Sequence, residues 1–189
     1  YLGKKKTREE MMELMEFFKR HKTPMFSTVG NQNPTPVKGL NLVEHFRQYG
    51  LQLLDEFEEW LTSQSKPVSI RESMDWMNSW NIERGMRRWN FTYAQMGADI
   101  ATYHPDLIDP NSLLHCGTNA RDGVNQLYLK PKGMSTEDFH DAALIDLTKT
   151  LGTSPLAHED TLCIFVRFLQ NVDRTGVNNK NNSGFEYLK

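Results

Sequence analysis

The chain has 189 residues, of which 38% are hydrophobic and 24% are charged, and its formal net charge is −2. No apolar run approaches the roughly 18 residues that cross a bilayer, which excludes an integral membrane protein and leaves no expected membrane partner. The near-neutral charge excludes a protein that holds nucleic acid through bulk positive charge alone.

The first predicted helix begins with a capping box, in which Thr7 caps the free N–H groups and Glu10 reaches back. Apolar residues then recur at helical spacing up to about His21. Residues 22–40 are rich in proline, glycine and asparagine, and a loop of this length is uncommon inside a compact domain. We therefore expect residues 1–40 to form an N-terminal arm, with a methionine-rich helix suited to docking on a neighbouring subunit.

Residues 41–170 are predicted to form the helical core. An apolar residue recurs every three or four positions over 41–62, which indicates a helix of about six turns. Ser69 with Glu72, at capping-box spacing, opens the next helix. Another helix is predicted to start near Asn81 and to stop before Pro105, because a residue ahead of proline avoids the helical region.

Residues 103–135 show the least regular pattern of the core. We predict a short helix over 110–114 and a short extended segment over 124–129. Ser135 then caps a helix that runs to Leu151, because acidic residues follow it in the first turn.

The last predicted helix begins at Ser154 and Pro155, a capping residue followed by proline at the position where its missing N–H is tolerated. Residues 171–189 have no apolar period and are predicted to be a C-terminal tail. The sequence therefore predicts an all-α fold with six to seven helices in one compact core, extended N- and C-terminal arms and no convincing sheet.

The histidines, cysteines and acidic residues never form a dense ligand pattern, so we predict no metal site and no cofactor. There is no phosphate-binding glycine loop either. His115 and Cys116 would act as base and nucleophile only if the fold bent one side chain onto the other, whereas neighbours in an extended loop point in opposite directions. We do not predict an enzyme.

The most suggestive stretch is rich in arginine and aromatic residues. On a helix, Arg84, Arg87 and Arg88 would share one face, and Trp89 and Tyr93 would form an adjoining stripe. Three guanidinium groups on one face can grip phosphates, and aromatic rings can stack on bases. In the alternative interpretation, the aromatic residues belong to the core and the arginines pair with nearby acidic residues.

One further basic cluster and one single arginine extend this pattern. Arg121, Lys130 and Lys132 form a second cluster in the irregular region, and Arg167 stands within the apolar last helix. An arginine in such an apolar helix usually needs an anionic partner or a groove. The predicted RNA-binding residues are Arg84, Arg87, Arg88, Arg121, Lys130 and Arg167.

Two segments within residues 82–150 carry a family resemblance. The first comprises Met86-Arg87-Arg88, Phe91, Tyr93-Ala94 and Ile100, and the second is Asp138-Phe139-His140-Asp141-Ala142. They are similar to a helix and to a later segment of the coat proteins of flexible filamentous plant viruses. The resemblance implies an all-α core, arms that link neighbouring subunits and a groove for genomic RNA. It also implies that Arg87 stands in an RNA-facing position.

Two functions remain open at this point. The first is a coat or nucleocapsid-type protein that assembles with copies of itself through its arms and binds single-stranded RNA non-specifically, in a virion or the host cytoplasm. The alternative is a helical accessory subunit of a large protein complex that binds no nucleic acid. Two widely spaced cysteines would place such a subunit in a reducing intracellular compartment.

Overall fold

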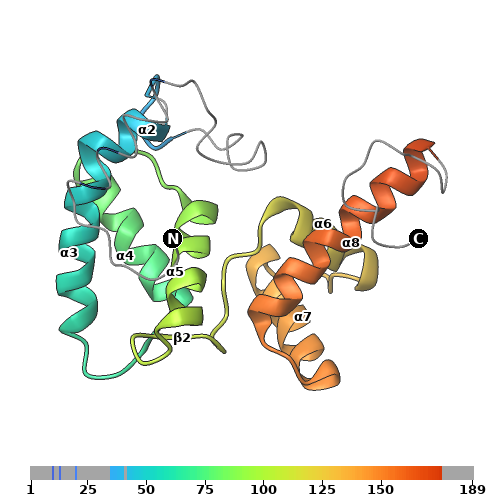
Figure 1. The fold of residues 1–189 in the computed structure, drawn as a ribbon. Coiled ribbons are helices and arrows are strands. Elements are labelled where there is room, and N and C mark those ends of the chain that lie inside the picture. The colour runs from blue at the N-terminus through green and yellow to red at the C-terminus, as the bar shows by residue number, and fades with distance from the viewer. Residues whose placement is uncertain (1–9, 11–12, 14–19, 21–34, 41, 176–189) are drawn as a thin grey trace. The chain divides into compact units, whose positions relative to one another are not determined.

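The computed structural model describes residues 10, 13, 20, 35–40 and 42–175. Within them the protein is all-α, as predicted, and the extended segments are two strands of two residues each (Figure 1). Most of the predicted arm at residues 1–40 and of the predicted tail at 171–189 lies outside the described residues. No helix in the described part of the chain combines the length and the apolar character that crossing a bilayer requires.

The chain divides into two compact units. The first consists of Tyr1–Ser65 with Met74–Tyr93, and the second consists of Lys66–Ser73 with Ala94–Lys189. Each unit buries its own set of apolar side chains, so each is described separately below.

The first unit contains a nearly continuous helical run. It consists of α2 (Leu42–His45), the π-helix η2 (Phe46–Gly50) and α3 (Leu51–Thr62). The helix predicted over 41–62 is confirmed for its described residues, although the π-helical turn near its start was not predicted. The buried residues of α3 repeat at intervals of four, and they are Leu53, Phe57 and Leu61.

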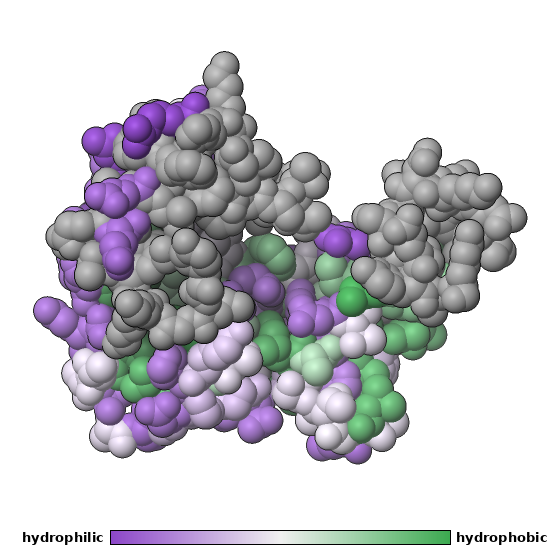
Figure 2. Space-filling model, in the orientation of Figure 1, coloured by the Kyte–Doolittle hydropathy of each residue, from purple (hydrophilic) through white to green (hydrophobic). Residues whose placement is uncertain are grey.

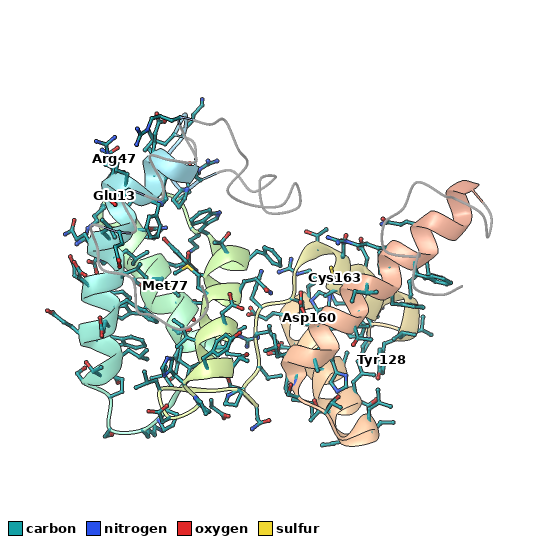
Figure 3. The ribbon with its side chains drawn as sticks, in the orientation of Figure 1. Glu13, Arg47, Met77, Tyr128, Asp160 and Cys163 are labelled. Atoms are coloured by element: carbon teal, nitrogen blue, oxygen red, sulfur yellow. The ribbon has the colours of Figure 1, made fainter. Side chains whose placement is uncertain are left out.

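All four tryptophans lie in the first unit. The ring of Trp60 stacks on Trp76, with ring centroids 5.4 Å apart, and on Phe57 at 5.6 Å. Met77, on the part of α4 that belongs to this unit, is fully buried (Figure 3). Aromatic stacking and methionine packing together fill this core.

The helix predicted from Asn81 is wrong at its start. In the structure α4 (Ile70–Glu83) continues past that position, and α5 (Asn90–Tyr103) begins only after an irregular segment, residues 84–89. Gly85 follows the end of α4 with a φ of 69°, a left-handed conformation that glycine adopts without steric cost.

Two buried asparagines hold the segment between α4 and α5 out of a helix. The Asn78 Oδ1 atom accepts a hydrogen bond from the backbone N–H of Trp89 at 2.7 Å. The Asn81 Nδ2 atom donates to the backbone oxygen of Arg87 at 3.1 Å, and its Oδ1 atom accepts from the Tyr93 hydroxyl at 3.0 Å. These side chains satisfy backbone groups that a continuous helix would have paired internally.

The second unit begins with a short parallel pairing of β1 (Val68–Ser69) and β2 (Ile108–Asp109), in which Val68 pairs with Ile108. The predicted capping box at Ser69 is confirmed, because its hydroxyl accepts from the Glu72 N–H at 3.0 Å while the Glu72 carboxylate accepts from the Ser69 N–H at 2.7 Å.

Three helices complete the second unit, namely α6 (Thr118–Leu127), α7 (Thr136–Leu151) and α8 (Pro155–Thr175). The predicted starts of α7 and α8 are confirmed, and Ser135 caps α7 by accepting from the Asp138 N–H at 3.0 Å. Since α8 runs to Thr175, the predicted tail begins at least five residues too early.

The prediction for the region before α7 is wrong in two places. Residues 110–114 form no helix, and residues 124–127 belong to α6 and not to an extended segment. The buried face of α6 consists of Ala120, Gly123 and Val124, which are small, so the segment contains few large apolar residues. Their small size instead lets α6 approach α8 closely, since a Cβ atom added at Gly123 would lie 2.9 Å from the backbone oxygen of Leu162.

Candidate functional site

Residues 84–89 do not place the predicted arginines on one helix face, which corrects that prediction. Arg84 lies in a turn after α4, whereas Arg87 and Arg88 lie in the irregular segment before α5. Because the two buried asparagines interrupt the helix between α4 and α5, the three arginine side chains do not lie on one helical face.

Arg84 makes its side-chain contacts within the first unit. Its guanidinium carbon lies 3.8 Å from the centre of the Trp80 ring, and its Nη2 atom lies 3.1 Å from a carboxylate oxygen of Glu56. Trp80 donates from its indole nitrogen to the same carboxylate at 2.7 Å. A hydrogen bond from Gln52, helped by Trp80 and Arg84, holds the pKa of Glu56 below its ordinary value. This cluster matches the alternative interpretation, in which arginines pair with acidic residues.

Arg87 and Arg88 differ in their contacts. The guanidinium group of Arg87 donates to the backbone oxygen of Thr35 at 2.9 Å. The backbone N–H of Arg87 donates to the backbone oxygen of Pro36 at 3.1 Å. Arg88 is exposed and makes no side-chain hydrogen bond or ion pair with any described residue. Of the three predicted arginines, Arg88 therefore retains a guanidinium group open to a partner.

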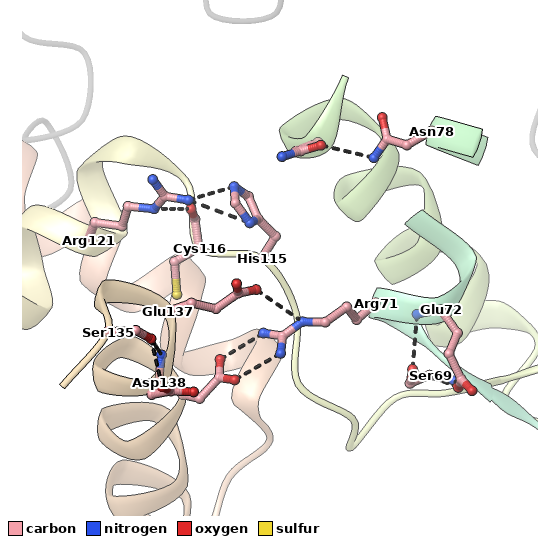
Figure 4. A network of polar contacts seen from close by, with 12 residues as sticks. Ser69, Arg71, Glu72, Asn78, His115, Cys116, Arg121, Ser135, Glu137 and Asp138 are labelled. Atoms are coloured by element: carbon pink, nitrogen blue, oxygen red, sulfur yellow. Dashed lines mark hydrogen bonds and ion pairs between the residues drawn. The ribbon is translucent and has the colours of Figure 1, made fainter. Parts of the chain in front are cut away.

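A pocket with a volume of about 140 Å³ lies in the second unit. Its wall comes from the start of α4, from the segment before α6, from α6 itself and from the first turns of α7 (Figure 4). The lining residues are Arg71, Leu114, His115, Cys116, Arg121, Thr136, Glu137, His140 and Asp141.

One side of the pocket is an arginine–carboxylate pair. Arg71 donates from both terminal nitrogens to the two oxygens of Asp141, at 2.8 and 2.7 Å, and its Nε atom lies 3.9 Å from Glu137. The paired side chains are 27% and 20% exposed. Such a bidentate pair fixes the orientation of both groups and neutralises the charge of Asp141.

Arg121, unlike Arg71, bonds to a backbone oxygen and a histidine ring and not to a carboxylate. It donates from Nε to the backbone oxygen of Cys116 at 2.9 Å, and its Nη2 atom lies 2.7 Å from His115 Nε2. An arginine only donates, so His115 Nε2 accepts and the ring is neutral. Burial, followed by the charge of Arg121, lowers the pKa of His115. Among the described residues Arg121 forms no ion pair with a carboxylate.

His140 also lines the pocket, and Lys130 lies next to one of the lining residues. His140 is 5% exposed, and its buried Nε2 atom has no hydrogen-bond partner. Burial is the largest effect that lowers the pKa of His140, and the charges of Arg121 and Lys130 lower it further. Lys130 is itself exposed and donates to the hydroxyl of Thr136, a lining residue, at 3.0 Å.

The remaining reactive group of the pocket is the thiol of Cys116. Burial, together with the nearby carboxylate of Glu159, raises its pKa to about 12. The thiol is therefore protonated at neutral pH, whereas nucleophilic catalysis requires the thiolate. Since Arg121 also occupies the ring nitrogen of His115, the residue pair His115–Cys116 is poorly suited to act as base and nucleophile.

Glu159, which is 2% exposed, binds the start of α6 by accepting from the Gly117 N–H at 2.9 Å. Burial raises the pKa of Glu159 above its ordinary value. Between the ordinary and the raised pKa the folded state binds more protons than the unfolded state, so this group adds stability as the pH falls through that window. We expect the free energy of unfolding of the native chain, relative to Glu159→Gln, to rise between pH 7 and pH 5 in urea denaturation. A relative fall over this range would contradict the assignment.

Of the predicted cluster, Arg121 lines the pocket and Lys130 donates to Thr136, which also lines it, whereas Arg167 lies exposed on α8. It also adds Arg71 and His140, which sequence reasoning missed. The partner of Arg71 lies 70 residues away along the chain, so no local pattern links them. The described residues contain no group of three or more His, Cys, Asp or Glu side chains placed to hold a metal ion.

No family model, curated protein or solved structure matches this chain.

Proposed function

We propose that this protein is a structural RNA-binding protein of the coat or nucleocapsid type, which assembles with copies of itself and contacts RNA phosphates without sequence preference. The observation that carries the proposal is the guanidinium group of Arg121, which forms no ion pair with a described carboxylate and lies in the same unit as Lys130. Arg88 and Arg167 are exposed and supply further cationic contacts. Arg84 and Arg87 are excluded from the contact set, because their guanidinium groups already bind Glu56 and Thr35.

The chemistry of these groups suits RNA phosphates. An arginine with unused N–H groups binds a phosphate oxygen through short, charge-assisted hydrogen bonds, and a lysine adds a point charge. A few separated cations on a near-neutral chain favour modest affinity that depends on added salt. Affinity would then be weak for a single subunit and stronger in an assembly, where neighbouring subunits share one strand.

The test measures binding of a fluorescent single-stranded RNA by anisotropy at several salt concentrations. We expect the logarithm of the affinity to fall linearly with the logarithm of the salt concentration. Replacing Arg121 and Lys130 with alanine should reduce that slope by about 1.4, because each lost contact on a single strand contributes about 0.7. Lys66→Ala with Lys149→Ala removes the same charge outside the pocket and serves as the control. Equal slopes for the two double variants would contradict the proposed contact.

A second candidate function has its own supporting observation. The contacts of Arg84 with Glu56 and Trp80 and of Arg87 with Thr35 are those expected of a helical accessory subunit in which arginines serve the fold. Electron microscopy of natively purified material separates the two candidates. Filaments or shells with excess absorbance at 260 nm support the coat protein, whereas discrete particles with a protein spectrum support the accessory subunit.

A further inference from the structure

The pocket of the second unit has two polar groups without partners in its wall. The Nη1 group of Arg121 makes no hydrogen bond with a described residue, and neither does the buried Nε2 atom of His140. The His140 Nε2 atom is buried, and a buried polar atom without a partner is destabilising, whereas Arg121 is half-buried and its Nη1 group is open to a ligand. Both groups would be satisfied by one ligand that accepts hydrogen bonds and carries negative charge.

We propose that this pocket binds a single phosphate group, supplied either as inorganic phosphate or as the 5′-terminal phosphate of an RNA strand. Arg121 contributes the charge and the free N–H groups, His140 contributes a hydrogen bond from its neutral ring, and Lys130 adds charge beside Thr136. Only the second source rests on the proposed function, because inorganic phosphate alone tests the pocket.

The carboxylates in the wall face Arg71. Both oxygens of Asp141 are occupied by Arg71. The Glu137 side chain is 64% exposed, so solvent screens its charge, and it faces the Arg71 Nε atom at 3.9 Å. Arg71 therefore neutralises Asp141, whereas neither Arg121 nor Lys130 forms an ion pair with a described carboxylate.

The size of the pocket selects among anions. A cavity of about 150 Å³ accepts a ligand as large as benzene, so the observed volume of about 140 Å³ holds a tetrahedral phosphate with some water. It has no room for a nucleoside in addition. An internal RNA phosphate, which is linked on both sides, fits such a pocket poorly, and a terminal phosphate is therefore the form expected from RNA.

The experiment follows the histidine and arginine side-chain resonances of the full chain by NMR during titration with sodium phosphate. Sodium acetate and sodium chloride at matched ionic strength are the controls. We expect saturable shifts for His140, His115 and Arg121 with phosphate only. Absence of these shifts, or equal shifts with acetate, would overturn the proposal without requiring any variant.

A variant then assigns the site. His140→Leu keeps a similar volume and removes the atom without a partner, so the fold should persist, and we expect phosphate affinity to fall at least fivefold. Arg88→Ala, which lies outside the pocket, is the matched control and should leave it unchanged. An unchanged affinity in His140→Leu would overturn the assignment of His140 as a ligand.

Paired RNA oligonucleotides with a 5′-phosphate or a 5′-hydroxyl distinguish the two sources. Tighter binding of the phosphorylated strand, by about tenfold, together with the pocket shifts, supports an RNA end as the ligand. Equal binding of the two strands with intact phosphate shifts supports free phosphate. If RNA does not bind while phosphate does, the proposed function fails and the phosphate site remains.

Discussion

Replacing Gly123 with valine is expected to lower the free energy of unfolding by about 3 kcal/mol, at the upper end of the usual cost of overpacking. A Cβ atom at this position would lie 2.9 Å from the Leu162 backbone oxygen and 3.0 Å from the Leu162 Cβ atom. The backbone of α8 cannot rotate away as a flexible side chain does, so α6 and α8 must separate.

Urea denaturation followed by far-ultraviolet circular dichroism measures this loss. Ala142→Val is the control, because it introduces valine at an exposed helical position of the same unit. Gly123→Ala should show a smaller loss, since alanine's better helix propensity of about 1 kcal/mol offsets part of the contact. A Gly123→Val chain as stable as the native one would show that α6 and α8 do not approach this closely.

Replacing Asn81 with alanine is expected to cost about 3 kcal/mol of stability. Asn81 is fully buried and links the backbone oxygen of Arg87 to the Tyr93 hydroxyl. Its loss leaves both partners without a hydrogen bond in an apolar setting, and each such group costs about 1–3 kcal/mol. The side chain also leaves a cavity, which adds to the cost.

The same denaturation experiment tests this expectation. Asn125→Ala, on the exposed face of α6, makes the same chemical change without burial and should alter stability by less than about 0.5 kcal/mol. Asn81→Ala would also raise the tendency of residues 84–89 to form helix, because the side-chain hydrogen bonds that compete with helical ones are gone. A loss no larger than that of Asn125→Ala would contradict the role assigned to Asn81.

Local chemistry explains which helices could be predicted from the sequence. The caps at Ser69, Ser135 and Ser154 act on backbone groups within three residues, and each marks its helix correctly. The boundary between α4 and α5 depends instead on Asn78 and Asn81, whose side chains replace helical hydrogen bonds with contacts up to 12 residues away. Periodicity alone does not contain that information.

The same distinction applies to α6 and to the pocket. The buried face of α6 is made of the small residues Ala120, Gly123 and Val124, so the segment has little apolar content, and the sequence Asp122-Gly123 indicates a turn. Arg121 and Lys130 were found because basic residues cluster locally. His140 was not singled out as a ligand, because its burial depends on the tertiary packing.

The placement of the tryptophans gives the molecule an optical reporter that is confined to one of its units. Indole emission excited near 295 nm arises only from the first unit, whereas circular dichroism sums the helices of both. Tryptophan emission should therefore distinguish the two variants. Asn81→Ala lies in the first unit and should directly shift the unfolding transition that tryptophan emission reports. Gly123→Val loosens α8 from α6 in the second unit. If this variant also shifts the unfolding transition measured by tryptophan emission, the two units unfold together as one cooperative system.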